Sequence, residues 1–410
     1  MRKLFIYGLG LINLVAIVII WWPNAGLNLI ALGHLAGLLL EYGILAQLVL
    51  VGRIGFVEQA FGHDGLNRLH RNLGICLLVL LVAHPVLLME GYGDWLLFTA
   101  SVDIFRAFIA LLIFFVAIGI SFAIVRKRLR YETWYFTHLF IYVAVLLAFS
   151  HQTLATDLSA GKPLYYWLIL NNVVFGLVLV YRFLRPLYNF YQHRFQIERV
   201  VPETHDVTSI YIGGREIDKF KFKPGQFVNV TFLRRGLWYT HPFSFSAAPN
   251  GKYLRLSIKA SGDFTSQIRN FKPGTKLILD GPLGIFTAQS ATQNKFLLIA
   301  GGIGITPLRS LAEELKQEKR DFVLFFANKT EADVVFKQEL EQLVPAGKWY
   351  NFFSQQNQYI DEEKITRLTP DFKEREVYLC GPPPMLRAVK QLLLKLGLPP
   401  AQLHYEIFAY

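Results

Sequence analysis

Long apolar runs dominate the first half of the chain, and short ones dominate the second half. Six runs before residue 190 approach the roughly 20 apolar residues that a bilayer-spanning helix needs. These runs are Leu4–Trp22, Leu27–Val51, Leu73–Met89, Ala107–Val125, Trp134–Phe149 and Leu164–Tyr181. The pattern therefore predicts a bundle of six transmembrane helices within residues 1–190.

Beyond residue 190 the apolar runs shorten and alternate with turn signals. β-rich runs such as Phe195–Val201 and Leu254–Ala260, separated by Pro-Gly turns, predict a small antiparallel β-barrel over residues 191–290. From residue 291 to 410, strands such as Phe296–Ala300 alternate with helical stretches, which predicts a parallel α/β domain. The expected fold class is therefore a multi-domain membrane protein with three parts.

The composition supports this prediction. Hydrophobic residues make up 53% of the 410 residues and charged residues only 18%, whereas soluble proteins have about a quarter charged residues. The net charge of +12 suggests nucleic-acid binding, but the apolar content indicates basic residues gathered on one side of a membrane, so no nucleic-acid partner is expected. Two distant cysteines, Cys76 and Cys380, exclude a disulfide framework, a zinc knuckle and covalent haem attachment.

Basic residues also predict the orientation of the helices. They cluster before the first run, between the second and third, after the fourth and after the sixth: Arg2, Lys3, Arg53, Arg68, Arg71, Arg126, Lys127, Arg128, Arg130, Arg182 and Arg185. The opposite loops are mainly acidic. Both termini are therefore expected in the cytoplasm of a multi-pass protein of the cell (inner) membrane. A signal peptide is the alternative for Leu4–Trp22, but no convincing cleavage site follows it.

Four histidines lie in or beside the third and fifth apolar runs. His70 and His84 are 14 residues apart, and His138 and His151 are 13 apart. At about 1.5 Å per residue, each spacing covers roughly 20 Å of helix. Since both helices are expected to run outward from the cytoplasm, the histidines form two pairs at matched depths. Two bis-histidine b-type haems need this arrangement.

Other interpretations of the membrane residues stay open. A single membrane histidine is more often a hydrogen-bonded core residue, and a histidine proton relay in a transporter is the alternative for the set. Thirteen residues separate two side chains by about 140° around an ideal helix, so the fifth helix is expected to be distorted, tilted or to reach the haems from different angles. His34, Glu41 and Arg106 are either paired structural groups or parts of an outer acceptor site.

Residues 241–246 carry groups that suit a flavin. Phe243 offers an apolar face, Ser244 a hydroxyl and His241 a charge, although an ordinary buried strand end would look similar. The small residues of Ser261–Ser266 are expected to open a helix whose N-terminal amides hold a pyrophosphate.

The segment Gly301–Pro307 directly follows a predicted strand. Thr306 suits a helix N-cap and Pro307 the first helical position, and the glycines let a phosphate approach the helix N-terminus. The motif is not a strict G-x-G-x-x-G, so a glycine-rich structural turn is the alternative.

Three further positions are candidates for nicotinamide chemistry. Cys380 could lie beside the nicotinamide ring, or it is a small buried cysteine. Lys329, after the second strand of the nucleotide domain, could meet the ribose phosphate of NADPH, with a solvated surface lysine equally expected. An aromatic residue at the chain end, Phe408 or Tyr410, could cover the flavin and move aside for nicotinamide.

Together these segments resemble a known family. Residues 195–410 resemble the ferredoxin–NADP reductase flavin modules, with His241, Phe243 and Ser244 in place of that family's Arg-x-Tyr-Ser, and the histidine spacing is similar to that of the NADPH oxidase and ferric reductase-like membrane proteins. The resemblance implies that His70 with His138 binds an inner haem, and His84 with His151 an outer one. Implied FAD contacts are His241, Pro242, Phe243, Ser244, Ser246, Lys259, Gly262, Thr265 and Ser266. Implied nicotinamide-nucleotide contacts are Gly301, Gly302, Gly304, Thr306, Pro307, Lys329, Cys380 and Gly381.

The resemblance also implies an activity. NADPH, or alternatively NADH, would reduce FAD, and electrons would pass singly through two b-type haems to an acceptor at the outer face. Dioxygen, giving superoxide, is the expected acceptor, and a ferric chelate is the alternative. The chain has no calcium-binding loop and no long insertion, so no cytosolic activator is expected.

Overall fold

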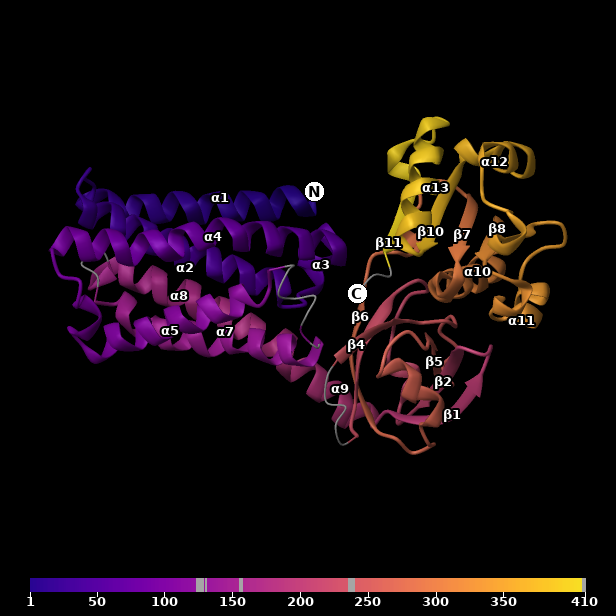
Figure 1. The fold of residues 1–410 in the computed structure, drawn as a ribbon, viewed down its shortest axis with the longest axis horizontal. Coiled ribbons are helices and arrows are strands. Elements are labelled where there is room, and N and C mark those ends of the chain that lie inside the picture. Colours follow the sequence, from indigo (N-terminus) through magenta and orange to yellow (C-terminus); the bar gives the residue numbers. More distant parts are fainter. Residues whose placement is uncertain (123–128, 130, 155–157, 235–239, 408–410) are drawn as a thin grey trace. The chain divides into compact units, whose positions relative to one another are not determined.

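The computed structural model describes residues 1–122, 129, 131–154, 158–234 and 240–407. It divides into two compact units. The first contains residues 1–61 and 65–182, and the second contains residues 62–64 and everything from residue 183 onward. Each unit is considered by itself below (Figure 1).

The first unit is a bundle of long helices. In chain order they are α1 (Arg2–Trp21), α2 (Leu29–Val51), the short α3 (Gly55–Phe61), α4 (His63–Tyr92), α5 (Val102–Gly119), α7 (Tyr131–Gln152) and α8 (Gly161–Val178). Within the described part of the chain, six helices are long and apolar enough to cross a membrane. This confirms the six predicted helices.

Packing in the bundle is that of a protein surrounded by lipid. Leu45, Leu81, Phe114, Ala144 and Val174, from five different helices, share one buried apolar cluster. Many other apolar side chains are exposed, above all along α1. A large exposed apolar surface marks an interaction site, and on helices of this length the bilayer is the expected partner.

The third predicted helix begins earlier than its apolar run. The run Leu73–Met89 is apolar, but α4 starts ten residues before it, at His63, and includes several polar positions. Hydropathy detects the apolar portion of a helix, and its polar first turns have no such signal. His70 therefore lies on the same helix as His84.

The second unit begins with α9 (Arg185–His193) and a β domain. Its strands are β1 (Gln196–Pro202), β2 (Val207–Gly213), β3 (Phe227–Phe232), β4 (Thr240–Ser244), β5 (Leu254–Lys259) and β6 (Leu277–Leu283). They form two antiparallel sheets, in the orders β1-β2-β5 and β4-β3-β6. Isolated bridges join Gln196 to Lys276 and Phe245 to Leu256. Among the described residues the predicted barrel is therefore two linked sheets around one apolar core, without continuous closure.

The remaining chain forms the predicted parallel α/β domain. Its strands are β7 (Lys295–Gly301), β8 (Asp321–Asn328), β9 (Trp349–Phe353), β10 (Arg375–Gly381) and β11 (Leu403–Ile407). They lie in the order β11-β10-β7-β8-β9, and every pair is parallel.

Helices of the α/β domain pack against two separate apolar clusters. The helices α10 (Ile305–Gln317) and α11 (Lys337–Leu343) contribute to one, whereas α12 (Glu362–Leu368) and α13 (Pro383–Lys395) contribute to the other. The chain proceeds from β7 outward to β8 and β9, and then returns to place β10 on the other side of β7. The strand order thus reverses between β7 and β10, and ligands of such sheets bind at the carboxyl ends of the strands at this point.

Candidate functional site

The four membrane histidines meet in two pairs between α4 and α7. The ring centres of His70 and His138 lie 6.3 Å apart, and those of His84 and His151 lie 6.2 Å apart. A metal–imidazole bond is about 2 Å long, and a ring nitrogen lies ~1 Å from its ring centre, so two imidazoles on opposite sides of one metal ion have centres about 6 Å apart. Both pairs have the separation that one haem iron between them requires.

Hydrogen bonds orient the rings in a form that suits metal binding. Nδ1 of His84 lies 2.9 Å from the carbonyl of Gly33, and Nδ1 of His151 contacts the carbonyl of Ala148. A carbonyl only accepts, so both Nδ1 atoms donate, and each Nε2 keeps the lone pair that a metal needs.

The inner pair is oriented differently. Nδ1 of His138 is 3.2 Å from the hydroxyl of Ser121, and the indole of Trp134 stacks on the His138 ring. Nδ1 of His70 is buried and has no hydrogen-bond partner among the described residues. The inner pair is therefore held by stacking and one hydroxyl, in place of two carbonyls.

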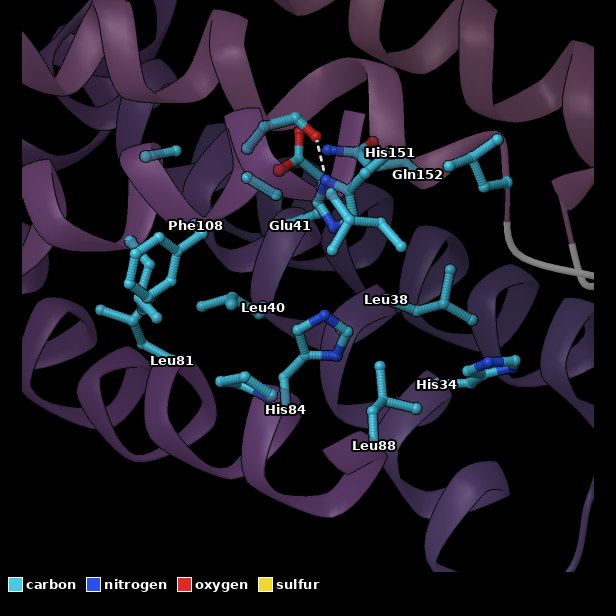
Figure 2. A pocket seen from close by; sticks show the side chains of 18 of the residues that line it. His34, Leu38, Leu40, Glu41, Leu81, His84, Leu88, Phe108, His151 and Gln152 are labelled. Atoms are coloured by element: carbon cyan, nitrogen blue, oxygen red, sulfur yellow. Dashed lines mark hydrogen bonds between the residues drawn. The ribbon is translucent and has the colours of Figure 1, made fainter. Parts of the chain in front are cut away.

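His84 and His151 point into one cavity of about 320 Å³ inside the bundle. Figure 2 shows the two rings in this cavity, with apolar side chains such as Leu40, Leu81 and Phe108 around them. Buried imidazole ligands within an apolar groove between helices suit a b-type haem. No group of three or more His, Cys, Asp or Glu side chains in the described ranges could hold a bare metal ion, so iron would be bound here by two histidines and a porphyrin.

Gly37 on α2 is part of this site, and the sequence analysis missed it. A Cβ at Gly37 would lie 2.6 Å from Cε1 and 2.7 Å from Nδ1 of His84. Only a residue without a side chain lets the His84 ring take this position. The available signal was the pair Gly33 and Gly37, four residues apart on one face of a membrane helix, since small residues at this spacing mark close helix approach.

Polar groups left open by the sequence also lie near the cavity. His34 and Glu41 both line it, and Oε1 of the buried Glu41 has no hydrogen-bond partner in the described part of the chain. Gln152 accepts a hydrogen bond of 2.7 Å from the indole of Trp167. Arg106 pairs with Asp103 at 3.1 Å, so its charge has a local partner.

The predicted flavin residues converge on β4. The ring of His241 stacks on that of Phe264 at 4.0 Å, and Phe243 packs partly into the core. The hydroxyl of Ser244 is buried and has no hydrogen-bond partner among the described residues. Since buried hydroxyls are normally satisfied, an orphaned one fits a bound group that supplies the partner. Pro242 lies beside them on the same strand, paired with Asn229.

Other implied flavin residues have local structural partners. The hydroxyl of Ser246 bonds to Ser257 at 2.7 Å, and Lys259 pairs with Asp206 at 3.0 Å. The segment after β5 does not open an α-helix as expected; Thr265–Asn270 is a short 3₁₀ helix. There the hydroxyl of Thr265 accepts from the amide of Gly262 at 3.1 Å, and the hydroxyl of Ser266 donates to the Gly262 carbonyl at 2.8 Å.

The glycine segment lies at the carboxyl ends of β7 and β10. A Cβ at Gly304 would lie 2.3 Å from the Cys380 carbonyl oxygen, and one at Gly301 would lie 2.4 Å from the Met385 sulfur. A Cβ at Gly381 would in turn crowd the Gly301 backbone at 3.0 Å. These three glycines therefore let the two strand ends approach each other. Gly302 differs, because its φ is +50° and no atom lies within 4 Å of its Cβ position.

The predicted helix cap in this segment is wrong by two residues. Gly302–Gly304 form a 3₁₀ turn, α10 starts at Ile305, and Gly304 is the N-cap. Thr306 and Pro307 lie inside the helix, and the hydroxyl of Thr306 donates to the Ile303 carbonyl at 3.0 Å. The turn begins the helix early, so no threonine cap is needed.

The remaining nucleotide candidates differ in exposure. Cys380 is fully buried; burial first, and the Glu406 carboxylate second, raise the pKa of its thiol well above the ordinary value. Lys329 is exposed directly after β8. Its neighbour Asn328 is buried, and its side-chain oxygen and nitrogen have no partner among the described residues. Phe408 and Tyr410 lie outside the described residues.

Three family models match consecutive parts of the chain. Residues 32–149 match the ferric reductase like transmembrane component, residues 194–287 an FAD-binding domain, and residues 298–391 an oxidoreductase NAD-binding domain. The chain is a ferric reductase-like membrane oxidoreductase. The order and nature of the three matches confirm the family resemblance expected from the histidine spacing and the flavin and nucleotide motifs.

Individual relatives match about half of this ferric reductase-like chain. The glycine betaine monooxygenase reductase subunit of Chromohalobacter salexigens is 28% identical over 240 residues, which are 53% of this chain and 64% of the relative. Flavohemoprotein B of Dictyostelium discoideum is 30% identical over 249 residues, 52% of this chain and 58% of the relative. The chain thus covers less than two thirds of either relative.

Among solved structures, the ferredoxin reductase in carbazole 1,9a-dioxygenase is similar to 52% of this chain, with 25% sequence identity and a TM-score of 0.45. The match covers 68% of that structure.

Proposed function

We propose that this protein carries electrons from cytosolic NADPH, through FAD and two b-type haems, to dioxygen at the outer face of the cell membrane. The observation that carries the proposal is the pair of histidine–histidine separations, 6.3 and 6.2 Å, in a chain that also has FAD-binding and NAD-binding domains. NADH is the alternative electron donor.

Named side chains would hold each cofactor. Bound FAD accepts the two electrons of a hydride together and releases them singly, and a haem carries one electron at a time. His70 with His138 and His84 with His151 would supply the axial nitrogens. The buried Ser244 hydroxyl would satisfy a polar atom of the flavin. The open position beside Gly302, at the strand reversal, would take the nucleotide phosphates.

The charge pattern of the nucleotide domain supports NADPH as the donor. Lys329 is exposed at the end of β8, where a cation can meet the additional phosphate of NADPH. Asn328 beside it offers an amide whose donor and acceptor atoms both lack partners within the described residues. Sequence motifs did not identify Asn328, because its signal is the unsatisfied burial of its side chain.

The outer histidine pair also constrains how an acceptor is reduced. If His84 and His151 occupy both axial positions, dioxygen has no open position on the metal. The acceptor would then have to approach from the side, where the cavity is lined by residues such as Phe108, Leu154 and Leu158. Apolar walls of this kind suit a small neutral molecule such as dioxygen.

The experiment that tests the proposal removes the outer pair. His84→Ala or His151→Ala should reduce the haem content of the purified protein by one of two haems and abolish acceptor reduction, while flavin reduction by NADPH persists. His205→Gln, which removes an exposed histidine from the FAD-binding domain, is the matched control and should retain both haems. Loss of both activities in the outer-pair variants, with FAD content and fold intact, would contradict the order of carriers.

A ferric chelate is the second candidate acceptor. The match of residues 32–149 to the ferric reductase like transmembrane component favours it. Cytochrome c reduction that superoxide dismutase suppresses identifies dioxygen as the acceptor. Reduction of ferric chelate under anaerobic conditions, with little superoxide in air, identifies the chelate.

A histidine-relay proton transporter with a regulatory nucleotide domain is the alternative from another class. It requires no haem, whereas the proposed oxidoreductase does. A Soret band together with an α band that dithionite reduces would exclude a haem-free transporter.

A further inference from the structure

Four charged side chains link the FAD-binding strands to the NAD-binding helices within the second unit. Arg255 lies on β5, Arg309 and Glu313 lie on α10, and Glu339 lies on α11. None of the motifs in the sequence pointed to them. We define this set as the interdomain charge bridge.

Arg255 anchors the bridge on the flavin side. Its side chain is only 2% exposed, and its two terminal nitrogens contact the two oxygens of Glu339 at 2.7 and 3.1 Å. Its Nε donates to the Ser246 hydroxyl at 3.1 Å, and a terminal nitrogen donates to the Ser246 carbonyl at 2.8 Å. Such a two-pronged pair fixes direction as well as distance.

Arg309 and Glu313 anchor the bridge on the nucleotide side. Arg309 reaches the same Glu339 carboxylate at 2.8 Å and also donates to the Ser246 carbonyl at 3.2 Å. Glu313 contacts Arg309 one helical turn along and accepts from the backbone amide of Ala248 at 2.8 Å. Glu339 therefore joins two arginines from opposite domains.

Burial opposes ionisation of Glu339, but its hydrogen bonds and ion pairs with Arg255 and Arg309 hold the pKa of the carboxyl below its ordinary value. The same partnership raises the pKa of Arg255 despite its burial. Both groups are therefore charged at neutral pH, so the bridge is an ion pair in the working protein.

The bridge connects the two places where the reacting molecules are expected. Ser246 lies two residues beyond Ser244, whose buried hydroxyl faces the flavin in the proposed function. Arg309 lies in the second turn of α10, which begins directly after the Gly302–Gly304 turn. The bridge therefore ties the flavin strand to the helix that presents the nucleotide.

Geometry is the property that such a bridge supplies. A buried ion pair adds little net stability, because desolvation offsets the attraction, but it can specify one arrangement of its partners. Two domains of one chain otherwise move relative to each other by default. A misplacement of about 1 Å between reacting atoms can slow a reaction ~100-fold.

We propose that Glu339 is a positioning residue for hydride transfer, holding the NAD-binding helix α10 against the flavin strand through Arg255 and Arg309. The inference rests on the proposed function and deepens it. In the step concerned, the C4–H bond of NADPH breaks, and its hydrogen and both electrons move to the flavin. NADPH becomes NADP⁺, and FAD becomes FADH⁻.

The test uses the purified full-length protein loaded with FAD and compares Glu339→Gln with wild type. Rapid mixing with NADPH without oxygen gives the rate of flavin reduction at saturation and the apparent Kd. Glu339→Gln should lower the saturated rate at least about tenfold and leave FAD content and Kd within about twofold. Glu339→Asp, which keeps the charge on a shorter side chain, should give an intermediate rate.

Glu341→Gln is the matched control, because Glu341 is exposed on the same helix. It should reduce the flavin at the wild-type rate. Arg309→Gln should slow reduction as well, and the double variant Glu339→Gln with Arg309→Gln should be no slower than the worse single variant, because both changes remove one bridge.

Three results would overturn the positioning role. An unchanged saturated rate in Glu339→Gln would remove it. A change confined to Kd or FAD content would show a binding or structural role instead, and an equal loss in Glu341→Gln would show a general defect of α11. Wild-type flavin that neither NADPH nor NADH reduces would refute the proposed function itself, and that trace is recorded before any variant is compared.

Discussion

At the scale of single residues, Gly37 and His84 show what a sequence cannot reveal alone. The spacing of 14 residues from His70 singles out His84 as a metal-ligand candidate. It does not show which neighbouring helix accepts the ring, because that depends on how α2 and α4 pack. The contact is visible only in three dimensions, where the ring occupies the space that a Gly37 side chain would take.

Gly37→Ala should therefore disturb the outer histidine pair. The added methyl would lie 2.6 Å from the His84 ring, so the ring must move. Overpacking of this kind costs about 1–3 kcal/mol. We expect the purified variant to contain one haem in place of two, measured by the pyridine haemochrome spectrum.

Gly176→Ala is the matched control for this variant, since no atom lies within 4 Å of its Cβ position on α8. It should retain both haems. A Gly37→Ala protein with full haem content and an unchanged spectrum would show that the His84 ring does not need its observed position.

Ser246 and Ser244 show a second limit at this scale. The resemblance implied a flavin role for both, yet the Ser246 hydroxyl bonds to Ser257 and Arg255, and only Ser244 has an orphaned hydroxyl within the described residues. Neighbouring serines have the same chemistry in a sequence, and packing separates their roles.

At the scale of elements, the strand–turn–helix around the glycine segment was predicted correctly, and its cap was not. The apolar strand and the glycines are local signals, so β7 and α10 were foreseeable. The 3₁₀ turn at Gly302–Gly304 depends on the close approach of Gly304 to the Cys380 backbone, which lies 76 residues away in the sequence. Such distant contacts leave no local pattern.

The two turn glycines should respond differently to alanine. At Gly304 the new methyl would lie 2.3 Å from the Cys380 carbonyl oxygen, so Gly304→Ala should lower the thermal stability of the NAD-binding domain. At Gly302 there is open space, but the φ of +50° costs about 1–2 kcal/mol for alanine. Gly302→Ala should mainly weaken NADPH binding, because its methyl would point toward the proposed phosphate position.

Circular dichroism melting and NADPH titration of both variants test this difference. The expected result is a larger fall in Tm for Gly304→Ala and a larger rise in Kd for Gly302→Ala. The reverse pattern would place the nucleotide elsewhere.

The helix α7 also corrects an expectation at this scale. A spacing of 13 residues suggested distortion, tilt or different approach angles, and α7 is α-helical throughout Tyr131–Gln152. The two pairs differ in ring orientation, with 76° between the planes of His70 and His138 and 47° between those of His84 and His151. Different approach angles of the side chains therefore absorb the irregular spacing.

At the scale of the whole molecule, the broad architecture was predictable because each part obeys a strong physical constraint. Spanning helices must be long and apolar, and parallel strands must alternate with helices. Closure of the β domain was not predictable, because it depends on which strand edges pair; here single bridges at Gln196 and Phe245 join the two sheets. The choice between Phe408 and Tyr410 stays a prediction, as both lie outside the described residues.

The charge asymmetry of the loops predicts the orientation of the chain. A fluorescent-protein fusion at the C-terminus should fluoresce, whereas alkaline phosphatase at the same place should be inactive, because both would lie in the cytoplasm. Alkaline phosphatase inserted after Gly93, in the loop between α4 and α5, should be active. The opposite activities would place the nucleotide module outside, away from cytosolic NADPH.

The optical spectrum of the detergent-purified full-length protein, recorded while NADPH is added without oxygen, tests the proposed electron path most directly. We predict a b-type haem Soret band and a reduced α band that develop after flavin bleaching, with two haems per chain. A colourless preparation, a single haem per chain after full reconstitution, or flavin bleaching with no change in haem absorbance would contradict it.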